Sequence, residues 1–411
     1  MRDTVLTIPS FRFLLLGRIA LTVSNQMLML IVGWQMYAIT HSACELGIVG
    51  LTQFAPALML CLVIGQIVDR HDRRRILIGC LVGQCAVCVL LLLGTLHGWL
   101  GRDLLLVASF GLGLAKAFQM PAQQALMPTL VPLPLLPRAL ATTATVSQFS
   151  IIVGPAVGGF IYAAGAAVVY LVCAGIGVLG MITIAMIRPG RAASSRAPMT
   201  LQSLVSGVQF IWKRKEVLGA TSLDLFAVLF GGATALLPVF ARDVLHTDSW
   251  GMGLLRSAPA LGALVVSLYL ARHPLQRRVG KKMLSAVCLY GVATVIFALS
   301  RYFALSFMAL MLTGAFDMVS NVVRQSLVQL QTPDDMRGRV SAVNSIFVGA
   351  SNQLGEFESG VTAGLFGAVP SVWIGGVGTV LIVMLWFRLF PGLANRESLL
   401  VGEPSRPACD G

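Results

Sequence analysis

We single out seven ionisable side chains that lie inside stretches otherwise apolar over about 20 residues, the length that crosses a bilayer. An ionised group at that depth costs several kcal/mol unless it is paired or hydrated, so each one is a candidate for function. They are Lys116, Asp224, Arg256, Asp317, Arg324, Glu356 and Glu358.

Two of the carboxylates, Asp317 and Glu356, lie deepest in their stretches, and Glu358 lies nearer the outer end of its own. Burial favours the neutral form of a carboxyl group, which suits it to take up and release a proton near neutral pH. Asp317 and Arg324 are seven residues apart and therefore share one helical face, where they can join one hydrogen-bonded network. We interpret Asp317, Glu356, Arg324 and Asp224 as a network for proton coupling.

Other roles stay open for three charged residues. Asp224 is predicted near an inner helix end and Arg256 near an outer one, where such side chains reach water or lock helices together. Lys116 fits two roles equally, attraction of an anionic substrate or neutralisation of a carboxylate in the resting state.

Motifs of enzymes are absent from the sequence. It contains no H-E-x-x-H, no G-x-S-x-G and no P-loop, and its five histidines are scattered. Cys85 and Cys88 form a C-x-x-C pair, but without a second ligand pair we interpret them as packing residues. We expect no enzymatic activity, metal or cofactor. An intramembrane enzyme or a receptor is the alternative from another class.

Composition indicates the kind of element that must position these residues. The chain has 411 residues, 56% of them hydrophobic and 11% charged, with a mean hydropathy of +0.83. A soluble domain carries about 25% charged residues, so we predict an all-α integral membrane protein with twelve transmembrane helices. The expected spans are 13–38, 45–67, 76–96, 103–126, 139–163, 166–187, 217–240, 251–271, 284–300, 305–330, 340–366 and 370–390.

The net charge of +13 is placed asymmetrically with respect to these spans. With both termini in the cytoplasm, the inner side receives the runs Arg70–Arg75, Lys213–Lys215 and Arg272–Lys282, whereas the outer side receives only Arg102, Arg242 and Arg301. An excess of basic residues on the inner side is what fixes orientation. We therefore attribute the charge to topology and expect no nucleic-acid partner.

The longest polar interruption divides the spans six and six. It gives an N-terminal bundle (1–187), a cytoplasmic linker (188–216), a C-terminal bundle (217–390) and a cytoplasmic tail (391–411). Apolar residues at helical spacing near the end of the linker predict an amphipathic helix, either on the membrane surface or packed against span ends. A weak repeat relates the bundles, because Pro132 precedes Arg138 as Pro333 precedes Arg339.

The turn between spans two and three carries a motif. Gly65, Asp69, Arg70, Arg73 and Arg74 belong to the segment GQIVDRHDRRR, which resembles the loop signature of the major facilitator superfamily. The resemblance implies two pseudo-symmetric six-helix bundles, close helix approach at the glycine, and a carboxylate and arginines that hold the inner gate. Here Asp72 stands where that signature usually has a second glycine, so the backbone of the turn is expected to differ.

Span five carries Gly154, Pro155, Gly158 and Gly159, which look like the Gly-Pro motif of the exporter branch of that superfamily. There the proline bends the helix and the glycines let it pack closely on the other half. Ser150 replaces a glycine of the fuller pattern, and small-residue packing alone explains Gly154 and Gly158 equally well.

Three longer segments are similar to the third drug:proton antiporter subgroup, which includes siderophore exporters, macrolide efflux proteins and lysophospholipid transporters. They are FQMPAQQALMPTLVP, LDLFAVLFGGATALLPVFA and PDDMRGRVSAVNS. In this fold, spans one, four, seven and ten line a central cavity. The resemblance therefore implies a substrate cavity with the residues Lys116, Gln35, Trp34, Phe118 and Asn321.

We therefore expect a proton-coupled exporter of a small amphipathic molecule that works by alternating access in a bacterial inner membrane. Its partners would be the substrate, protons and the bilayer, with the chain acting as a monomer. A lysophospholipid or lipid flippase of the same fold is the alternative. The sequence does not name the substrate.

Overall fold

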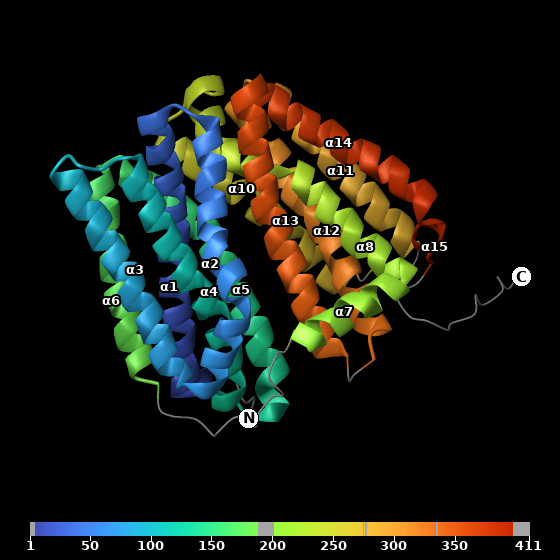
Figure 1. Cartoon of the computed structure of the whole chain (residues 1–411), viewed down its shortest axis with the longest axis horizontal. Coiled ribbons are helices and arrows are strands. Elements are labelled where there is room, and N and C mark those ends of the chain that lie inside the picture. The colour runs from blue at the N-terminus through green and yellow to red at the C-terminus, as the bar shows by residue number, and fades with distance from the viewer. Residues whose placement is uncertain (1–4, 188–200, 274, 276–277, 334–335, 398–411) are drawn as a thin grey trace, which may run out of the picture.

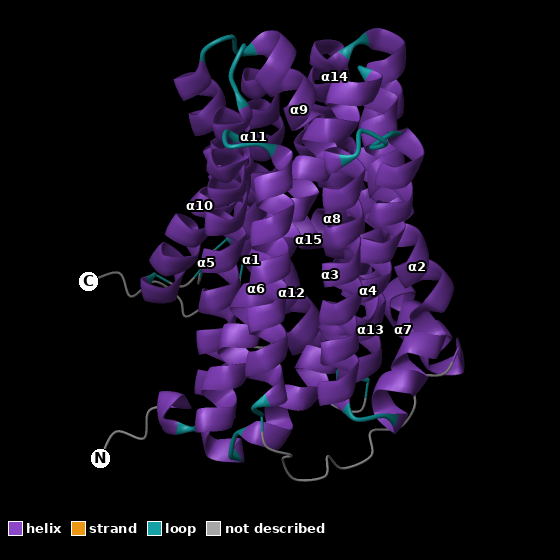
Figure 2. Cartoon of the chain, turned by 90° about the vertical axis from the view of Figure 1, so that its left-hand side faces the viewer, coloured by secondary structure: helices purple, strands orange, loops and turns teal. Residues whose placement is uncertain are grey.

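The computed structural model describes residues 5–187, 201–273, 275, 278–333 and 336–397. Side chains of a few further residues, Asp69 among them, lie outside the described part. The predicted linker residues 188–200 and tail residues 398–411 also lie outside it. Within these limits the chain is helical, and the turns lie at the two ends of the bundle (Figure 2).

The helices of the first half agree with the first six predicted spans within a few residues at most ends. They are α1 (Pro9–Thr40), α2 (Ala43–Arg70), α3 (Arg73–Leu96), α4 (Arg102–Leu130), α5 (Leu136–Tyr162) and α6 (Ala166–Ala185), with short 3₁₀ turns at Val5–Thr7 and Leu133–Leu135. A further helix, α7 (Leu201–Lys213), follows at the end of the predicted linker.

The second half begins with an interrupted helix. Its parts are α8 (Lys215–Phe230), a 3₁₀ turn (Gly232–Leu236), α9 (Leu237–Val239) and a π turn (Phe240–Val244). The break lies at Gly231, whose carbonyl accepts a hydrogen bond from Tyr290 Oη at 3.1 Å. The remaining helices are α10 (Ser249–Arg272), α11 (Val279–Leu299), α12 (Phe303–Gln331), α13 (Arg337–Phe366), α14 (Ala368–Leu389) and the short α15 (Pro391–Ala394).

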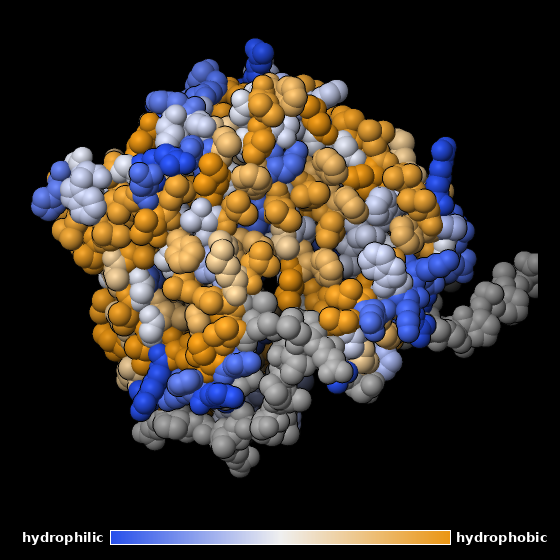
Figure 3. Space-filling model, in the orientation of Figure 1, coloured by the Kyte–Doolittle hydropathy of each residue, from blue (hydrophilic) through white to orange (hydrophobic). Residues whose placement is uncertain are grey.

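Among the described residues, eleven helical segments are long and apolar enough to cross a membrane. The twelfth long helix, α13, is the least apolar of the set and carries Glu356 and Glu358. Exposed leucine, valine and phenylalanine side chains cover the middle of the molecule, and polar residues gather at its two ends (Figure 3). The predicted fold class, an all-α membrane protein of two six-helix bundles, is confirmed.

The halves have equivalent internal packing. The helix pairs α2–α4 and α1–α5 in the first half correspond to α10–α12 and α8–α13 in the second. Gly113 of α4 lies against the Gln53 carbonyl, and Gly314 of α12 lies against the Pro259 carbonyl, so closely that a methyl group would fit at neither glycine. Equivalent glycines therefore set equivalent helix crossings.

The two halves meet at one end of the molecule and part at the other (Figure 1). We call the end that carries Arg70–Arg75, Lys213–Lys215 and the start of α1 the basic face, and the other end the opposite face. The principal contacts between halves are α2 with α13 and α5 with α10. The residues that touch there lie in the parts of these helices nearer the opposite face.

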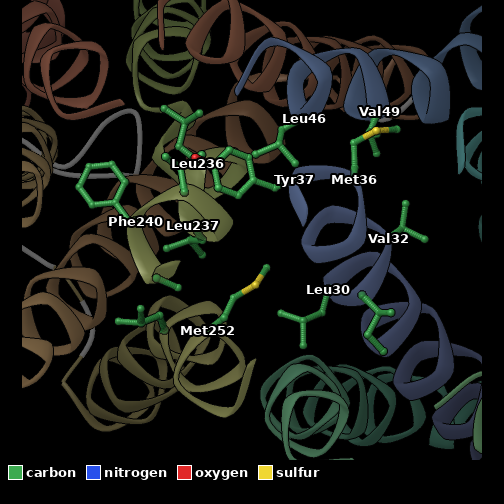
Figure 4. Close-up of a cluster of buried hydrophobic side chains, with 14 of the residues drawn as sticks. Leu30, Val32, Met36, Tyr37, Leu46, Val49, Leu236, Leu237, Phe240 and Met252 are labelled. Carbon is green, nitrogen blue, oxygen red and sulfur yellow. The ribbon is translucent and has the colours of Figure 1, made fainter. Parts of the chain in front are cut away.

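A cluster of buried apolar side chains closes the opposite face (Figure 4). Met36, Leu46 and Val49 contribute from the first half, and Leu236, Leu237, Phe240 and Met252 from the second. Beside this cluster, Tyr37 Oη donates a hydrogen bond to the Asp243 carboxylate across the two halves. The structure is therefore a conformation closed at the opposite face.

Two short helices cover the basic end of the second half. Of the two placements predicted for the linker helix, α7 adopts the one against span ends, because Ile211 is buried with Val217, Val340 and Val343. The beginning of the tail is also ordered. Leu393 and Ala394 of α15 are buried, and Arg396 pairs with Glu216.

Candidate functional site

The crossing of α5 and α10 contains the glycine-proline segment. A Cβ atom on Gly253 would lie 2.5 Å from the Pro155 carbonyl, and one on Gly159 would overlap the Ser249 carbonyl. Ser249 Oγ donates to the Gly159 carbonyl at 3.0 Å, which strengthens the contact. Gly154 and Gly158 instead pack on α1 of their own half. Only the Pro155–Gly159 edge of the motif therefore touches the other half.

The crossing of α2 and α13 is the equivalent contact on the other side. A Cβ atom on Gly360 would lie 2.8 Å from Gly47 Cα. One turn further along α2, a Cβ atom on Gly50 would lie 2.8 Å from Glu356 Oε2. The carboxylate of Glu356 thus occupies the space that Gly50 leaves free on the first half.

Charged side chains of both halves lie next to this crossing. Lys116, in the middle of the 29-residue helix α4, is exposed, which is consistent with an open space between the halves. Arg256 of α10 and Glu356 of α13 are half-buried, and both are within electrostatic range of Lys116. Lys116 and Glu356, which were predicted as separate sites, are therefore brought together, with Arg256 as a third member.

A second cluster lies wholly in the C-terminal half. Arg324 Nη2 is 3.2 Å from Asp224 Oδ2, and both side chains are about 95% buried, with 4% and 5% exposure. Arg324 also donates to Asn321 Oδ1 at 3.2 Å and to Asn344 Oδ1 at 3.5 Å. The partner of Arg324 is thus Asp224, and not the Asp317 expected from their shared helical face.

Asp317 differs from Asp224 in its surroundings. It lies in the middle of α12, is exposed, and has Asp224 and Arg324 within electrostatic range. In the described part of the chain it makes no hydrogen bond or ion pair. Asp317 can therefore change its protonation state without breaking an ion pair, whereas the paired and buried Asp224 cannot.

Three residues predicted for the substrate cavity lie elsewhere. Trp34 lines a hollow of about 480 Å³ at the opposite face, together with Ala38, Arg242, His246, Thr247 and Asp248. Gln35 is buried and accepts a hydrogen bond from Tyr170 Oη within the first half. Phe118 packs in an apolar cluster of that half. Asn321 is half-buried and belongs to the Arg324 cluster.

The turn between α2 and α3 lies at the basic face. Asp72 is the N-cap of α3 and accepts a hydrogen bond from the Arg74 N–H at 2.9 Å. Its φ of −63° needs no glycine, which explains why a carboxylate can replace the glycine expected there. Arg74 donates to the Ala185 carbonyl at the end of α6.

The other gate residues make fewer contacts. Arg70 is exposed, Arg73 is half-buried, and a Cβ atom on Gly65 would meet nothing within 4 Å. The Asp69 side chain lies outside the described part. Where the structure describes it, the hydrogen bonds and ion pairs of the turn are therefore made with the first half alone.

Two polar residues near the site were not among the predicted site residues. The Gln353 side-chain oxygen is buried beside Gly50 without a hydrogen-bond partner among the described residues. Arg18 of α1, near the basic face, donates to Ser147 of α5 at 2.7 Å. Both lie within predicted spans, Arg18 as a charge and Gln353 as one of several polar side chains, and polarity inside an apolar span is the signal that marks them.

Comparisons with known proteins agree with this architecture. The profile described as Major Facilitator Superfamily matches residues 14–356. Similar curated proteins include the enterobactin exporter EntS of Citrobacter koseri, 26% identical over 398 residues that cover 93% of this chain and 92% of that protein. The EntS of Escherichia coli O139:H28 is also 26% identical, with 92% and 91% covered.

Solved structures show the same fold at low sequence identity. A bacterial homolog of the human lysosomal transporter Spinster, in an inward-facing and occupied conformation, superposes with a TM-score of 0.74 at 13% identity, covering 93% of this chain and 97% of that one. The nucleoside transporter NupG gives a TM-score of 0.69 at 12% identity, with 93% and 99% covered. By sequence and by fold, this chain belongs to the major facilitator superfamily of membrane transporters.

Proposed function

We propose that this transporter is a proton-coupled exporter of a small amphipathic molecule, which works by alternating access. One observation carries the proposal. Ionisable groups of both halves gather where the halves cross, in a conformation that is closed at the opposite face and parted at the basic face. A transporter needs such a site to be reachable from one side at a time.

The orientation follows from the charge distribution. The basic face carries Arg70–Arg75, Lys213–Lys215 and Arg278–Lys282, and the positive-inside rule assigns such a face to the cytoplasm. Both termini would then be cytoplasmic, and the conformation would be open to the cytoplasm. The enterobactin exporters among the relatives favour a bacterial inner membrane and a siderophore-like or drug-like substrate.

Coupling requires a group whose protonation has different free energies in the two conformations. Our candidates for this group are Asp317 and Glu356, because neither is held in an ion pair in the described part of the chain. The Asp224–Arg324 pair lies within one half and would move with it as a unit, so we assign it to structure. The α2–α3 turn would hold the basic face closed in the alternative conformation.

The test is transport by the purified chain in proteoliposomes with an imposed pH gradient. We expect efflux of a siderophore or macrolide that stops when a protonophore is added. The single variants Asp317→Asn and Glu356→Gln identify the coupling carboxylate, and at least one of them should lose the dependence on the gradient. If both keep it, the coupling assignment is wrong. Transport of lysophospholipid that ignores the protonophore would instead support a lipid flippase.

A further inference from the structure

Three charged side chains lie within electrostatic range of one another, and one of them, Glu356, lies at the α2–α13 crossing. Lys116 comes from α4, Arg256 from α10 and Glu356 from α13. Each of the two cations is within electrostatic range of Glu356, and Lys116 is also within range of Arg256. No hydrogen bond or ion pair joins the three among the described residues. Two cations therefore share one carboxylate without direct contact.

The Asp224–Arg324 pair shows what a structural ion pair looks like in this protein. Its atoms are 3.2 Å apart, both side chains are nearly fully buried, and asparagines satisfy further donors of the guanidinium. The Lys116 cluster differs in each respect, because its members are exposed or half-buried and separated. A buried, directly bonded pair such as Asp224–Arg324 stabilises the fold. Charged groups that are separated and not fully buried can instead bind another charged group.

The Glu356 carboxylate packs against Gly50 of the first half. Its Oε2 atom lies in the space beside Gly50, and the unpaired side-chain oxygen of Gln353 lies next to the same glycine. Both side chains come from one face of α13. A carboxylate held there neutralises part of the charge of Lys116 and Arg256 and leaves a net charge of about +1 in the cluster, since two cations face one anion.

We propose that Lys116 and Arg256 form a binding site for the anionic group of an organic substrate, with Glu356 as the resident counter-ion that this group displaces. The inference rests on the proposed transport function and names its substrate class. It also gives the two deep carboxylates different roles. Glu356 must stay ionised because it acts as the counter-ion. The exchangeable proton then belongs to Asp317.

The position of the two cations gives the site a role in the conformational cycle. Lys116 belongs to the N-terminal half and Arg256 to the C-terminal half. An anion that contacts both would therefore bridge the halves. Charge-assisted hydrogen bonds to such an anion are among the stronger polar interactions in proteins. Opening of the opposite face would separate the cations, weaken the bridge and return Glu356 to its place.

The experiment measures binding of two probes with one ring system and opposite charge, 1-naphthoate and 1-naphthylmethylammonium. The full chain in dodecyl maltoside micelles is dialysed to equilibrium against each probe, and empty micelles correct for partitioning. We expect saturable binding of naphthoate and much weaker binding of the ammonium probe. Lys116→Met and Arg256→Gln should each weaken naphthoate binding about tenfold or more, the loss of one charge-assisted hydrogen bond.

Two variants test the charge argument itself. Lys116→Arg should keep naphthoate binding within about threefold, because it preserves the cation, and Glu356→Gln should tighten binding several-fold, because it removes the competing anion. Arg242→Gln is the matched control, since it removes a cation at the opposite face beyond the cluster of Leu236 and Phe240. Gel filtration and thermal unfolding check that every variant is folded.

The proposal fails if folded Lys116→Met and Arg256→Gln bind naphthoate like the unaltered chain. It also fails if the ammonium probe binds as tightly, if Arg242→Gln causes the same loss, or if neither the unaltered chain nor Glu356→Gln binds naphthoate saturably. Competition by phosphatidylglycerol would identify a lipid headgroup as the source of the anion, and its absence a free organic anion. Binding in micelles needs no gradient, so its failure leaves the result for proton-driven efflux standing.

Discussion

Lys116 of α4 and Asp317 of α12 occupy equivalent positions in the two halves. Each follows, by one helical turn, the glycine that brings its helix against a neighbour: Gly113 against Gln53, and Gly314 against Pro259. Both side chains are exposed in the middle of 29-residue helices. The internal repeat therefore places a cation and a carboxylate at equivalent points, so the two halves carry opposite charges at the same depth of corresponding helices.

Because Asp317 is exposed and unpaired in the described chain, Asp317→Asn should change the free energy of unfolding by less than about 0.5 kcal/mol. The same variant should lose proton-driven transport if Asp317 carries the proton. Thermal unfolding in detergent and efflux from proteoliposomes measure the two effects on one preparation. A large loss of stability would show that Asp317 has a structural partner after all.

Asp224→Asn should behave in the opposite way. It leaves the buried Arg324 guanidinium without its carboxylate, and breaking a buried pair costs about 3–5 kcal/mol. The double variant Asp224→Asn with Arg324→Gln should recover part of that loss, because no charge is left uncompensated. A double-mutant cycle of chemical unfolding measures the coupling, and additive losses would contradict the pairing.

Gly253→Val should weaken closure of the opposite face, because its Cβ would lie 2.5 Å from the Pro155 carbonyl of the other half. We expect faster labelling of a cysteine placed at Leu236 by an impermeant maleimide, in a background without other cysteines. Gly175→Val is the matched control, since a Cβ atom there meets nothing within 4 Å. Equal labelling in both variants would argue against this crossing as the closure contact.

Tyr37→Phe removes the hydrogen bond to Asp243 that joins the halves beside the apolar cluster. One hydrogen bond to a charged group contributes about 1.5–3 kcal/mol, so the closed conformation should become less populated. Hydrogen exchange of the peptides that cover Leu236 and Phe240 would report the shift as faster deuterium uptake. Tyr302→Phe, at a side chain that is 77% exposed, should leave the exchange unchanged.

Asp72→Ala should destabilise the start of α3, because the carboxylate accepts the Arg74 N–H. Loss of an N-cap costs about 0.5–2 kcal/mol. Asp72→Asn keeps the accepting oxygen and should cost little, which separates capping from charge. Thermal unfolding of the two variants checks the ranking, and an equal loss in both would point to the charge.

Hydropathy predicted the transmembrane helices well, because a bilayer constrains every span to a similar length and composition. The break of the seventh span at Gly231 was not predicted; the carbonyl it frees accepts a hydrogen bond from Tyr290, which lies on a different helix. The pairing of Arg324 with Asp224 was missed for a related reason. Helical periodicity compares residues within one helix, and Asp224 reaches Arg324 from another one.

Side-chain direction limited the predictions at the site. Trp34 was predicted in the central cavity because α1 is expected to line it, but in this structure the indole lines the hollow beside Arg242 near the end of the helix. Lys116 was predicted from the cost of burying a charge, which depends only on depth along the helix. Its neighbours Arg256 and Glu356 come from two other helices, so their proximity to Lys116 depends on tertiary packing and could not be predicted from the sequence.

The pairing of Arg396 with Glu216 bears on how the protein can be handled. Glu216 stands at the start of α8 and also accepts a hydrogen bond from Gln331 at 2.7 Å, so three segments converge on one carboxylate. An affinity tag that replaced the chain from Pro391 onward would expose the apolar residues that Leu393 covers. It would also remove Arg396, the ion-pair partner of Glu216. Purification handles are therefore better fused beyond Glu397 or at the start of the chain, where this junction stays whole.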